Sequence, residues 1–225
     1  MKNGRMTRSG LIAALDVGTS KVCCLIARVP EEGQPRVVGI GHQICNGLKG
    51  GIIVDIQATE AAILGAVHSA ETMAGETLHD VIINLSAGHP VSRSTGAEVS
   101  VGGHTIGDAD LRRVLAQSTQ SNGHGDAEII HALPIGFSID GDRGIRDPRG
   151  MYGERLGVEV HMITASGGAV RNLKTCVERC HLSVDKFVVS SYASGLAALV
   201  EDEIDLGVIV LDDGSTDGTQ EELAS

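Results

Sequence analysis

Apolar and polar positions alternate in short blocks at the start of the chain, a pattern that predicts strands joined by tight turns. Strand-length apolar runs cover Leu11–Leu15 and Val22–Arg28 on either side of the polar stretch DVGTSK, and a third run follows at Val37–Cys45. Runs of this length, rich in Val, Ile and Leu and bounded by turn residues, are typical of strands. We therefore expect a hairpin followed by a third strand.

A helix and a buried strand are predicted next. Between Asp55 and Met73, apolar or small residues recur at helical spacing, with Asp55 as the N-cap and Gly75 as the residue that ends the helix. The apolar run DVIINLS at Asp80–Ser86 is bounded by turn residues and predicts a buried strand.

Glycine, serine and charged residues become more frequent after Ala87, which predicts a small α+β insertion up to the region of Tyr152. Its predicted elements are a strand at Val91–Val101, a helix at Ala109–Ser118 capped by Asp108, a strand at Glu128–Ile139 interrupted by Pro134, and a long loop at Gly141–Gly153.

Strands and helices alternate again after this insertion. We expect strands at Leu156–Ala165, Ser183–Ser190 and Gly207–Leu211, and helices at Ala169–Cys180 and Ser194–Val200. Such alternation favours an α/β fold, with a mixed sheet, helices on both of its faces, and the small α+β domain inserted.

Composition narrows the function classes. The chain has 225 residues, 42% of them hydrophobic, which is enough for a proper core. A formal net charge of −11 disfavours non-specific binding to nucleic acid or anionic lipid, and an aromatic content of 2% leaves few platforms for stacking bases. The odd number of cysteines, five, without a signal peptide, indicates reduced thiols in the cytoplasm.

The turn between the first two strands has the chemistry of a phosphate and Mg²⁺ site. Gly18 lets the backbone approach an anion, Thr19 and Ser20 offer hydroxyl and N–H donors, Lys21 offers a positive charge, and Asp16 offers a carboxylate for metal-bound water. An ordinary hairpin with a polar turn is an equally open interpretation of this short motif.

A second acidic, glycine-bearing turn follows the last predicted strand, at Asp212 and Gly214. Turns at strand ends of a common sheet can face one crevice, so the two turns together could clamp a Mg²⁺–polyphosphate. The pair is more specific than either turn alone.

With these turns and an insertion between them, the chain resembles the actin-like ATPase superfamily and, within it, the FtsA family of bacterial cell-division proteins in its alphaproteobacterial form. The segments that carry the resemblance are Leu11–Val29, Gly47–Ile63, Val81–Gly88, Glu178–Glu203 and above all GIRDPRGMYGERLGVEVHMITA at Gly144–Ala165.

The resemblance implies an actin-like (ribonuclease H-like) fold and a division of the chain. The expected parts are a flexible N-terminus at 1–10, a first part of the actin-like subdomain at 11–86, an inserted FtsA-specific domain at 87–159, the continued subdomain at 160–212, and an atypical tail at 213–225.

The resemblance also implies a role and a location. The protein would be an adaptor that binds ATP and Mg²⁺, is at most a weak ATPase, links FtsZ filaments to the membrane and recruits later division proteins. Recruitment and self-association would use the inserted domain. It would be cytoplasmic and peripheral at the inner face of the cell membrane, at the division site. Most of the FtsZ contact and a membrane-binding helix belong to a second half absent here, so we expect an N-terminal portion.

Matching the family's motifs onto this chain assigns roles to individual residues. Asp16, Gly18, Thr19, Ser20 and Lys21 would contact nucleotide phosphate or Mg²⁺, and Asp212 and Gly214 would do so at the second turn. Asp16 and Asp212 would hold Mg²⁺ through water, and Asp212 is the nominated catalytic group. The expected interaction residues of the inserted domain are Arg146, Asp147, Arg149 and Tyr152, although a solvated loop held by Asp142 and Asp147 is an open alternative.

The second turn departs from the family pattern, because Ser215, Thr216 and Asp217 replace its glycine–threonine continuation. The tail VIVLDDGSTDGTQEEL is instead similar to the nucleotide-sugar turn of family-2 glycosyltransferases. Truncation or frame disruption, a designed or recombined sequence, and natural drift are the open explanations.

Two other functions stay in view. A kinase-like phosphotransferase with the same fold would share the first turn, but it needs an acceptor pocket with a catalytic carboxylate, and no such constellation stands out. A nucleotide-independent, self-associating interaction module would depend on the loop Gly144–Tyr152.

Overall fold

The computed structural model describes residues 10–32, 34–120 and 125–200, in two compact units. The inserted unit is Pro90–Gly167, and the flanking unit consists of the described chain on either side of it, residues 10–89 and 168–200. The predicted strand at Gly207–Leu211, together with Asp212 and Gly214, lies outside the described residues.

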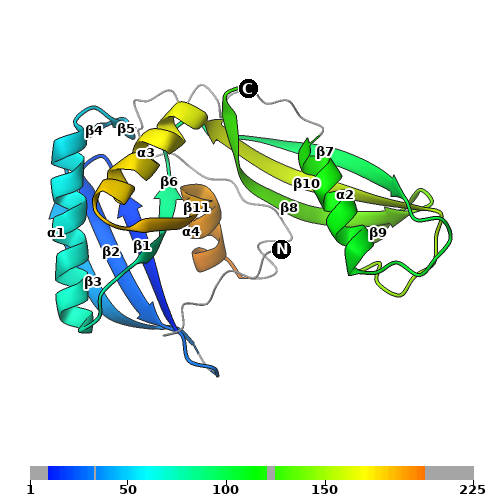
Figure 1. Ribbon diagram of the computed structural model, residues 1–225, viewed down its shortest axis with the longest axis horizontal. Helices are drawn as coiled ribbons and strands as arrows, with labels where there is room; N and C mark the ends of the chain where they lie inside the picture. Colours follow the sequence, from blue (N-terminus) through cyan, green and yellow to red (C-terminus); the bar gives the residue numbers. More distant parts are fainter. Residues whose placement is uncertain (1–9, 33, 121–124, 201–225) are drawn as a thin grey trace. The chain divides into compact units, whose positions relative to one another are not determined.

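A five-stranded mixed sheet forms the centre of the flanking unit (Figure 1). β1, β2 and β3 form an antiparallel meander, and β6 and β11 extend the sheet in parallel with β1 on its other side. The strand order is β11-β6-β1-β2-β3, and the strands are β1 (Leu11–Val17), β2 (Lys21–Arg28), β3 (Arg36–Ile44), β6 (Asp80–Leu85) and β11 (Ser183–Val189).

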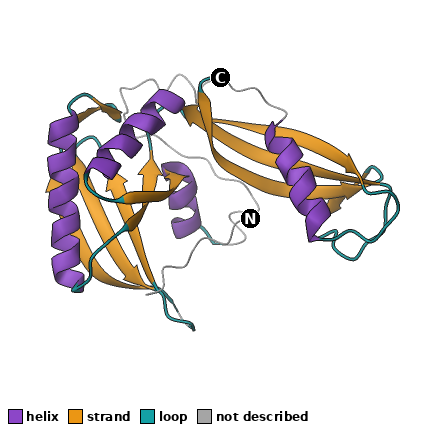
Figure 2. Ribbon diagram, in the orientation of Figure 1, coloured by secondary structure: helices purple, strands orange, loops and turns teal. Residues whose placement is uncertain are grey.

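Helices lie on both faces of this sheet, as predicted. They are α1 (Ile56–Ala74), α3 (Gly167–Arg179) and α4 (Ser190–Ala198). α1 packs on β2 and β3, and α3 lies beside α1, where the Arg179 guanidinium is 2.9 Å from the Glu60 carboxylate. α4 contacts β6 and β11 from the opposite side (Figure 2).

The caps predicted for α1 are confirmed. The Asp55 carboxylate accepts a hydrogen bond of 3.0 Å from the Ala58 N–H, and Gly75 ends the helix in the left-handed conformation with φ of 69°. The start of α1 follows directly on a short hairpin, β4 (Leu48–Lys49) with β5 (Ile52–Ile53). The sequence pattern predicts this hairpin only as a glycine-bearing loop.

Two glycines of β3 allow α1 to pack directly on the sheet. A Cβ at Gly41 would collide with the carbonyl oxygen of Ala66, and one at Gly39 with that of Ala70. Ala66 and Ala70 are themselves fully buried. Helix backbone and strand backbone therefore meet without an intervening side chain.

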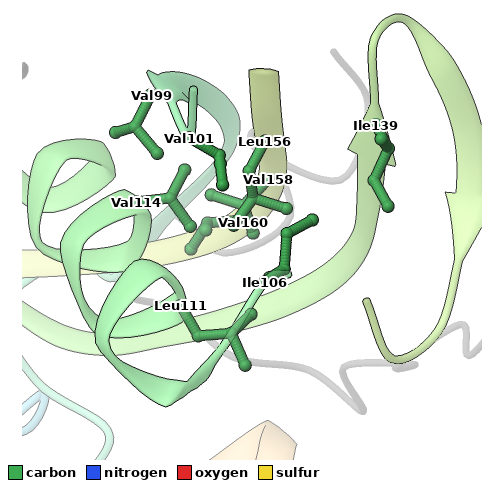
Figure 3. Packing of buried hydrophobic residues seen from close by; sticks show 9 residues of the cluster. All are labelled: Val99, Val101, Ile106, Leu111, Val114, Ile139, Leu156, Val158 and Val160. Carbon is green, nitrogen blue, oxygen red and sulfur yellow. The ribbon is translucent and has the colours of Figure 1, made fainter. Parts of the chain in front are cut away.

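The inserted unit is a four-stranded antiparallel sheet with α2 (Asp108–Gln120) packed on one face. Its strand order is β7-β10-β8-β9, with β7 (Val91–Ser100), β10 (Arg155–Ser166), β8 (Ala127–Ile139) and β9 (Asp142–Ile145). Figure 3 shows Leu111 and Val114 of α2 against Leu156, Val158 and Val160, which alternate along β10 toward the helix. Full burial of each such side chain contributes about 1.5–3 kcal/mol.

Four boundaries differ from the sequence prediction. β9 forms inside the predicted loop 141–153, because Phe137 and Ile139 pair with Ile145 and Asp142. The predicted domain end at 159 falls within β10, which pairs with β7 and β8 along its length, so the unit extends to Gly167. α4 begins at Ser190 rather than Ser194. Asp108 is the first residue of α2 and not its cap; the Asp110 carboxylate instead accepts from the Gly107 N–H at 3.1 Å.

Replacing Gly41 tests the direct contact between α1 and β3. Gly41→Ala forces a methyl group into helix backbone, and we expect it to lower the free energy of unfolding by about 3 kcal/mol, the upper end of overpacking costs. Urea denaturation of the full chain measures this. In the control Gly195→Ala, on α4 of the same unit, the new Cβ meets only Leu199 Cδ1 at 3.7 Å. Equal stability of the two variants would contradict the packing described.

Candidate functional site

The turn between β1 and β2 is the first candidate site. Asp16 lies within β1 and is exposed, Val17 ends the strand, and exposed Thr19 and Ser20 form the tip before Lys21 begins β2. The tip is closed by a hydrogen bond of 2.9 Å from the Gly18 N–H to the Lys21 carbonyl. The structure thus brings the predicted carboxylate, hydroxyls and ammonium group to one end of the sheet.

The sequence pattern predicts that Gly18 lets the backbone approach an anion, whereas in the structure the missing side chain makes room for the Lys21 carbonyl oxygen. Gly18 does not have a positive φ, but a Cβ at this position would lie 3.1 Å from the Lys21 carbonyl oxygen. The glycine therefore permits the tight closure of the turn, and it leaves the outer side of the tip open.

Three neighbouring segments hold the turn. The Asn84 side chain at the end of β6 accepts from the Val17 N–H at 3.1 Å, and its amide donates to Ser190 Oγ at 3.0 Å. The Cys45 N–H donates to the Ser20 carbonyl at 3.0 Å, and the Gly51 N–H donates to Thr19 Oγ1 at 2.9 Å. The turn is thus a rigidly supported element.

Sequence reasoning missed the residues that support this turn, among them Asn84 and Gly51. Their hydrogen-bond partners are 67 and 32 positions away in the sequence, so a local sequence pattern does not predict these contacts. The only signal is that Asn84 is a polar residue within the otherwise apolar run DVIINLS.

The donor set fits a magnesium–polyphosphate better than a metal ion alone. Among the residues that the structure describes, no group of three or more His, Cys, Asp or Glu side chains is placed to hold a metal. Asp16 is one carboxylate beside hydroxyl and amide donors, which suits a cation that keeps most of its water and is bound mainly through phosphate oxygens.

The second candidate site is the loop between β9 and β10, which contains the predicted interaction residues. Arg149 is held by two carboxylates: its Nε donates to Asp108 Oδ1 at 2.7 Å and its Nη1 to Asp147 Oδ2 at 3.0 Å. The backbone of the loop pairs with Ile106, which donates to the Met151 carbonyl at 2.9 Å and accepts from the Gly150 N–H at 3.0 Å. Arg149 and Asp147 therefore fix the loop.

All four predicted residues are exposed, but Arg149 and Asp147 are paired with each other, and Arg149 also with Asp108. Tyr152 leaves 72% of its surface accessible although its backbone forms a bridge with Thr105. A large aromatic side chain is thus presented to solvent on a fixed backbone. The predicted set of four divides into two residues that hold the loop and two that project from it.

Comparisons with known proteins bear on both sites. Residues 87–164 match the family described as the SHS2 domain inserted in FtsA. Curated proteins named Cell division protein FtsA are 43% identical to the chain over 217 residues in Agrobacterium fabrum, 44% over 217 residues in Rhizobium meliloti and 29% over 210 residues in Escherichia coli. These matches cover 92%, 92% and 93% of this chain, and 49%, 49% and 50% of the relatives.

Among solved structures, the chain is similar to one described as the PilM-PilN type IV pilus biogenesis complex. The TM-score is 0.53 at 15% identity, covering 82% of this chain and 49% of that one, which is a likeness of fold. None of the described helices is long and apolar enough to cross a membrane.

Fold and insertion together define an α/β protein with a mixed sheet and an inserted unit that matches the SHS2 domain inserted in FtsA. The resemblance inferred from the sequence is confirmed: the chain is FtsA-like, and it spans about half the length of the curated FtsA relatives it matches.

The start of α2, on which the loop rests, gives a pH prediction. The hydrogen bond from the Gly107 N–H, and then His104 and Arg113, hold the pKa of Asp110 below its ordinary value although burial acts in the opposite direction. A carboxylate with a depressed folded-state pKa stabilises the fold above its unfolded pKa of about 3.9, and this stabilisation is lost as the pH falls further.

We therefore expect Asp110→Asn to make the thermal midpoint less dependent on pH between about pH 5 and pH 2, measured in melts that follow the amide resonances of β10. The matched control is Asp142→Asn, an exposed carboxylate of the same unit. A pH profile of Asp110→Asn as steep as that of the wild type would refute the role given to Asp110.

Proposed function

We propose that this chain acts in bacterial cell division as a nucleotide-dependent adaptor, with the phosphates of Mg–ATP at the β1–β2 turn and protein partners on the inserted unit. One observation carries the proposal: a supported turn with exposed hydroxyls, an ammonium group and a carboxylate lies in a chain that is FtsA-like. The partners we propose are FtsZ and later division proteins, at the inner face of the cell membrane.

Each residue of the turn has a defined task toward the nucleotide. Thr19 and Ser20 donate to phosphate oxygens, Lys21 balances negative charge, and Asp16 orients water bound to Mg²⁺. Bound Mg²⁺ would supply charge neutralisation at the phosphates. Asp212 and Gly214 remain proposed as the second phosphate turn.

An adaptor suits these residues better than a phosphotransferase. Hydrolysis or transfer needs a group that positions the nucleophile in addition to phosphate contacts. Within the described residues the turn offers Asp16 as its carboxylate, and this is already the proposed partner of metal-bound water. Asp212 is therefore our proposed catalytic group for any weak ATPase activity.

The inserted unit offers the protein-binding surface. Tyr and Arg are among the side chains most enriched at the energetic centres of interfaces, and Tyr152 and Arg146 are both exposed on this loop. Because Arg149 and Asp147 fix the loop, little conformational entropy is lost when a partner binds it. We propose this loop, Arg146–Tyr152, as a contact for self-association or for division proteins.

Nucleotide binding is tested by thermal melts with and without Mg–ATP. A ligand that binds only the folded state at 100 times its Kd adds about 2.7 kcal/mol of stability, which for a chain of this size raises the midpoint by several degrees. We expect this shift in the wild type and its loss in Asp16→Asn and Lys21→Ala. The controls Asp185→Asn and Lys174→Ala, at exposed sites on β11 and α3, should keep the shift.

Loss of the shift in the two controls as well would contradict a phosphate site at this turn. A wild-type protein that melts cooperatively but shows no shift with Mg–ATP would overturn nucleotide binding by this chain and favour the interaction module.

The interaction surface is tested at Tyr152. We expect Tyr152→Ala to weaken association, self-association included, at least fivefold in sedimentation equilibrium, because truncating an interfacial anchor costs more than about 1 kcal/mol. Val91→Ala removes a half-exposed apolar side chain elsewhere in the same unit and serves as the control. Unchanged association in Tyr152→Ala would exclude Tyr152 from the interface.

A further inference from the structure

The hairpin β4–β5 contacts the proposed phosphate turn at one atom pair. The Gly51 N–H donates to Thr19 Oγ1 at 2.9 Å. Gly50 and Gly51 form the turn of this hairpin, and both have positive φ, 55° and 73°. Gly51 is therefore in a conformation that side-chain-bearing residues rarely adopt, with its N–H directed at Thr19.

The hairpin is anchored so that this N–H has little freedom. Lys49 pairs with Ile52 and Leu48 with Ile53, and Leu48 is buried. The Gly47 carbonyl accepts from the N–H groups of Val54 and Asp55 at 2.8 and 3.0 Å, which ties the base of the hairpin to the N-cap of α1. On its other side Gly51 approaches Ala87, whose Cβ would be 3.2 Å from a Cβ placed on Gly51.

This contact determines what the Thr19 hydroxyl can do. A hydroxyl group has one donor hydrogen and two acceptor lone pairs, and an exposed threonine without a partner samples several χ1 rotamers. Here one lone pair accepts from Gly51, so the side chain is held in one rotamer and the O–H hydrogen cannot point toward Gly51. Two staggered positions remain for the hydrogen, and because Thr19 is exposed at the tip, a phosphate oxygen bound there can accept from it.

We propose that Gly51 is a positioning residue that orients the Thr19 hydroxyl as a hydrogen-bond donor to a phosphate oxygen. This inference rests on the proposed function, because it concerns the same ligand at the same turn. It also specifies the contact: Thr19 binds the phosphate itself and not the Mg²⁺ ion. Its contribution to affinity is therefore present with metal-free ATP as well as with Mg–ATP.

The test measures the affinity of the full chain for Mg–ATP and for ATP with EDTA by titration calorimetry. Thr19→Val removes the hydroxyl and keeps the shape, and we expect it to weaken both affinities about tenfold or more, as for one hydrogen bond to a charged group. Thr19→Ser keeps the hydroxyl and should retain most of the affinity. Gly51→Ala displaces the N–H and should weaken both affinities to a similar extent.

The double variant separates positioning from general damage to the hairpin. If Gly51 acts through the Thr19 hydroxyl, Gly51→Ala has no further effect in the Thr19→Val background, so the two losses are not additive. Gly50→Ala strains an adjacent positive φ of the same turn and should leave both affinities near wild type. The chemical shift of the Gly51 amide proton should change in Thr19→Val and persist in Thr19→Ser.

The outcomes distinguish the inference from the function on which it rests. Additive losses, or equal losses in Gly50→Ala and Gly51→Ala, would overturn the positioning role while leaving nucleotide binding in place. A loss in Thr19→Val that appears only with Mg–ATP would reassign Thr19 to the metal. Wild-type protein that binds neither form of ATP would overturn the proposed function and this inference together.

Discussion

The contact between α1 and the glycines of β3 is the constraint on which the flanking unit depends. Because Gly41 has no side chain, the Ala66 backbone rests directly on the strand, and this sets the position of the whole helix. The N-cap of α1 in turn fixes the base of the β4–β5 hairpin through Asp55 and the Gly47 carbonyl. The packing of α1 on β3 thus helps to set the position of the Gly51 N–H, which in turn holds the Thr19 hydroxyl.

Both candidate sites follow one physical principle: long-range hydrogen bonds hold a short polar segment whose own sequence would leave it flexible. At the β1–β2 turn the supports come from Asn84, Cys45 and Gly51. At the Arg146–Tyr152 loop they come from Asp108 and the Ile106 backbone. Residues that are exposed on such a segment, such as Tyr152, are then available to a ligand or partner at a smaller cost of ordering the backbone.

Local patterns predict most elements and the chemistry of the turn, but not what holds it. The caps Asp55 and Gly75, the hairpin around DVGTSK, and the α/β class all follow from spacing and residue type. The supports of Thr19 and Val17 join residues 32 and 67 positions apart, and Arg149 reaches Asp108 over 41 positions, so they depend on the tertiary fold. For the same reason the local pattern groups Arg149 with Arg146, although the fold pairs Arg149 with two carboxylates and leaves Arg146 exposed.

The central claim is that phosphate binds at the β1–β2 turn, and paramagnetic relaxation of backbone amides by Mn–ATP tests it most directly. Mn²⁺ replaces Mg²⁺ in similar oxygen sites and broadens nearby resonances. We expect the amides of Gly18, Thr19 and Gly51 to broaden first, and the effect to disappear on competition with Mg–ATP. Selective broadening elsewhere, with these three amides unchanged, would contradict a phosphate site at this turn.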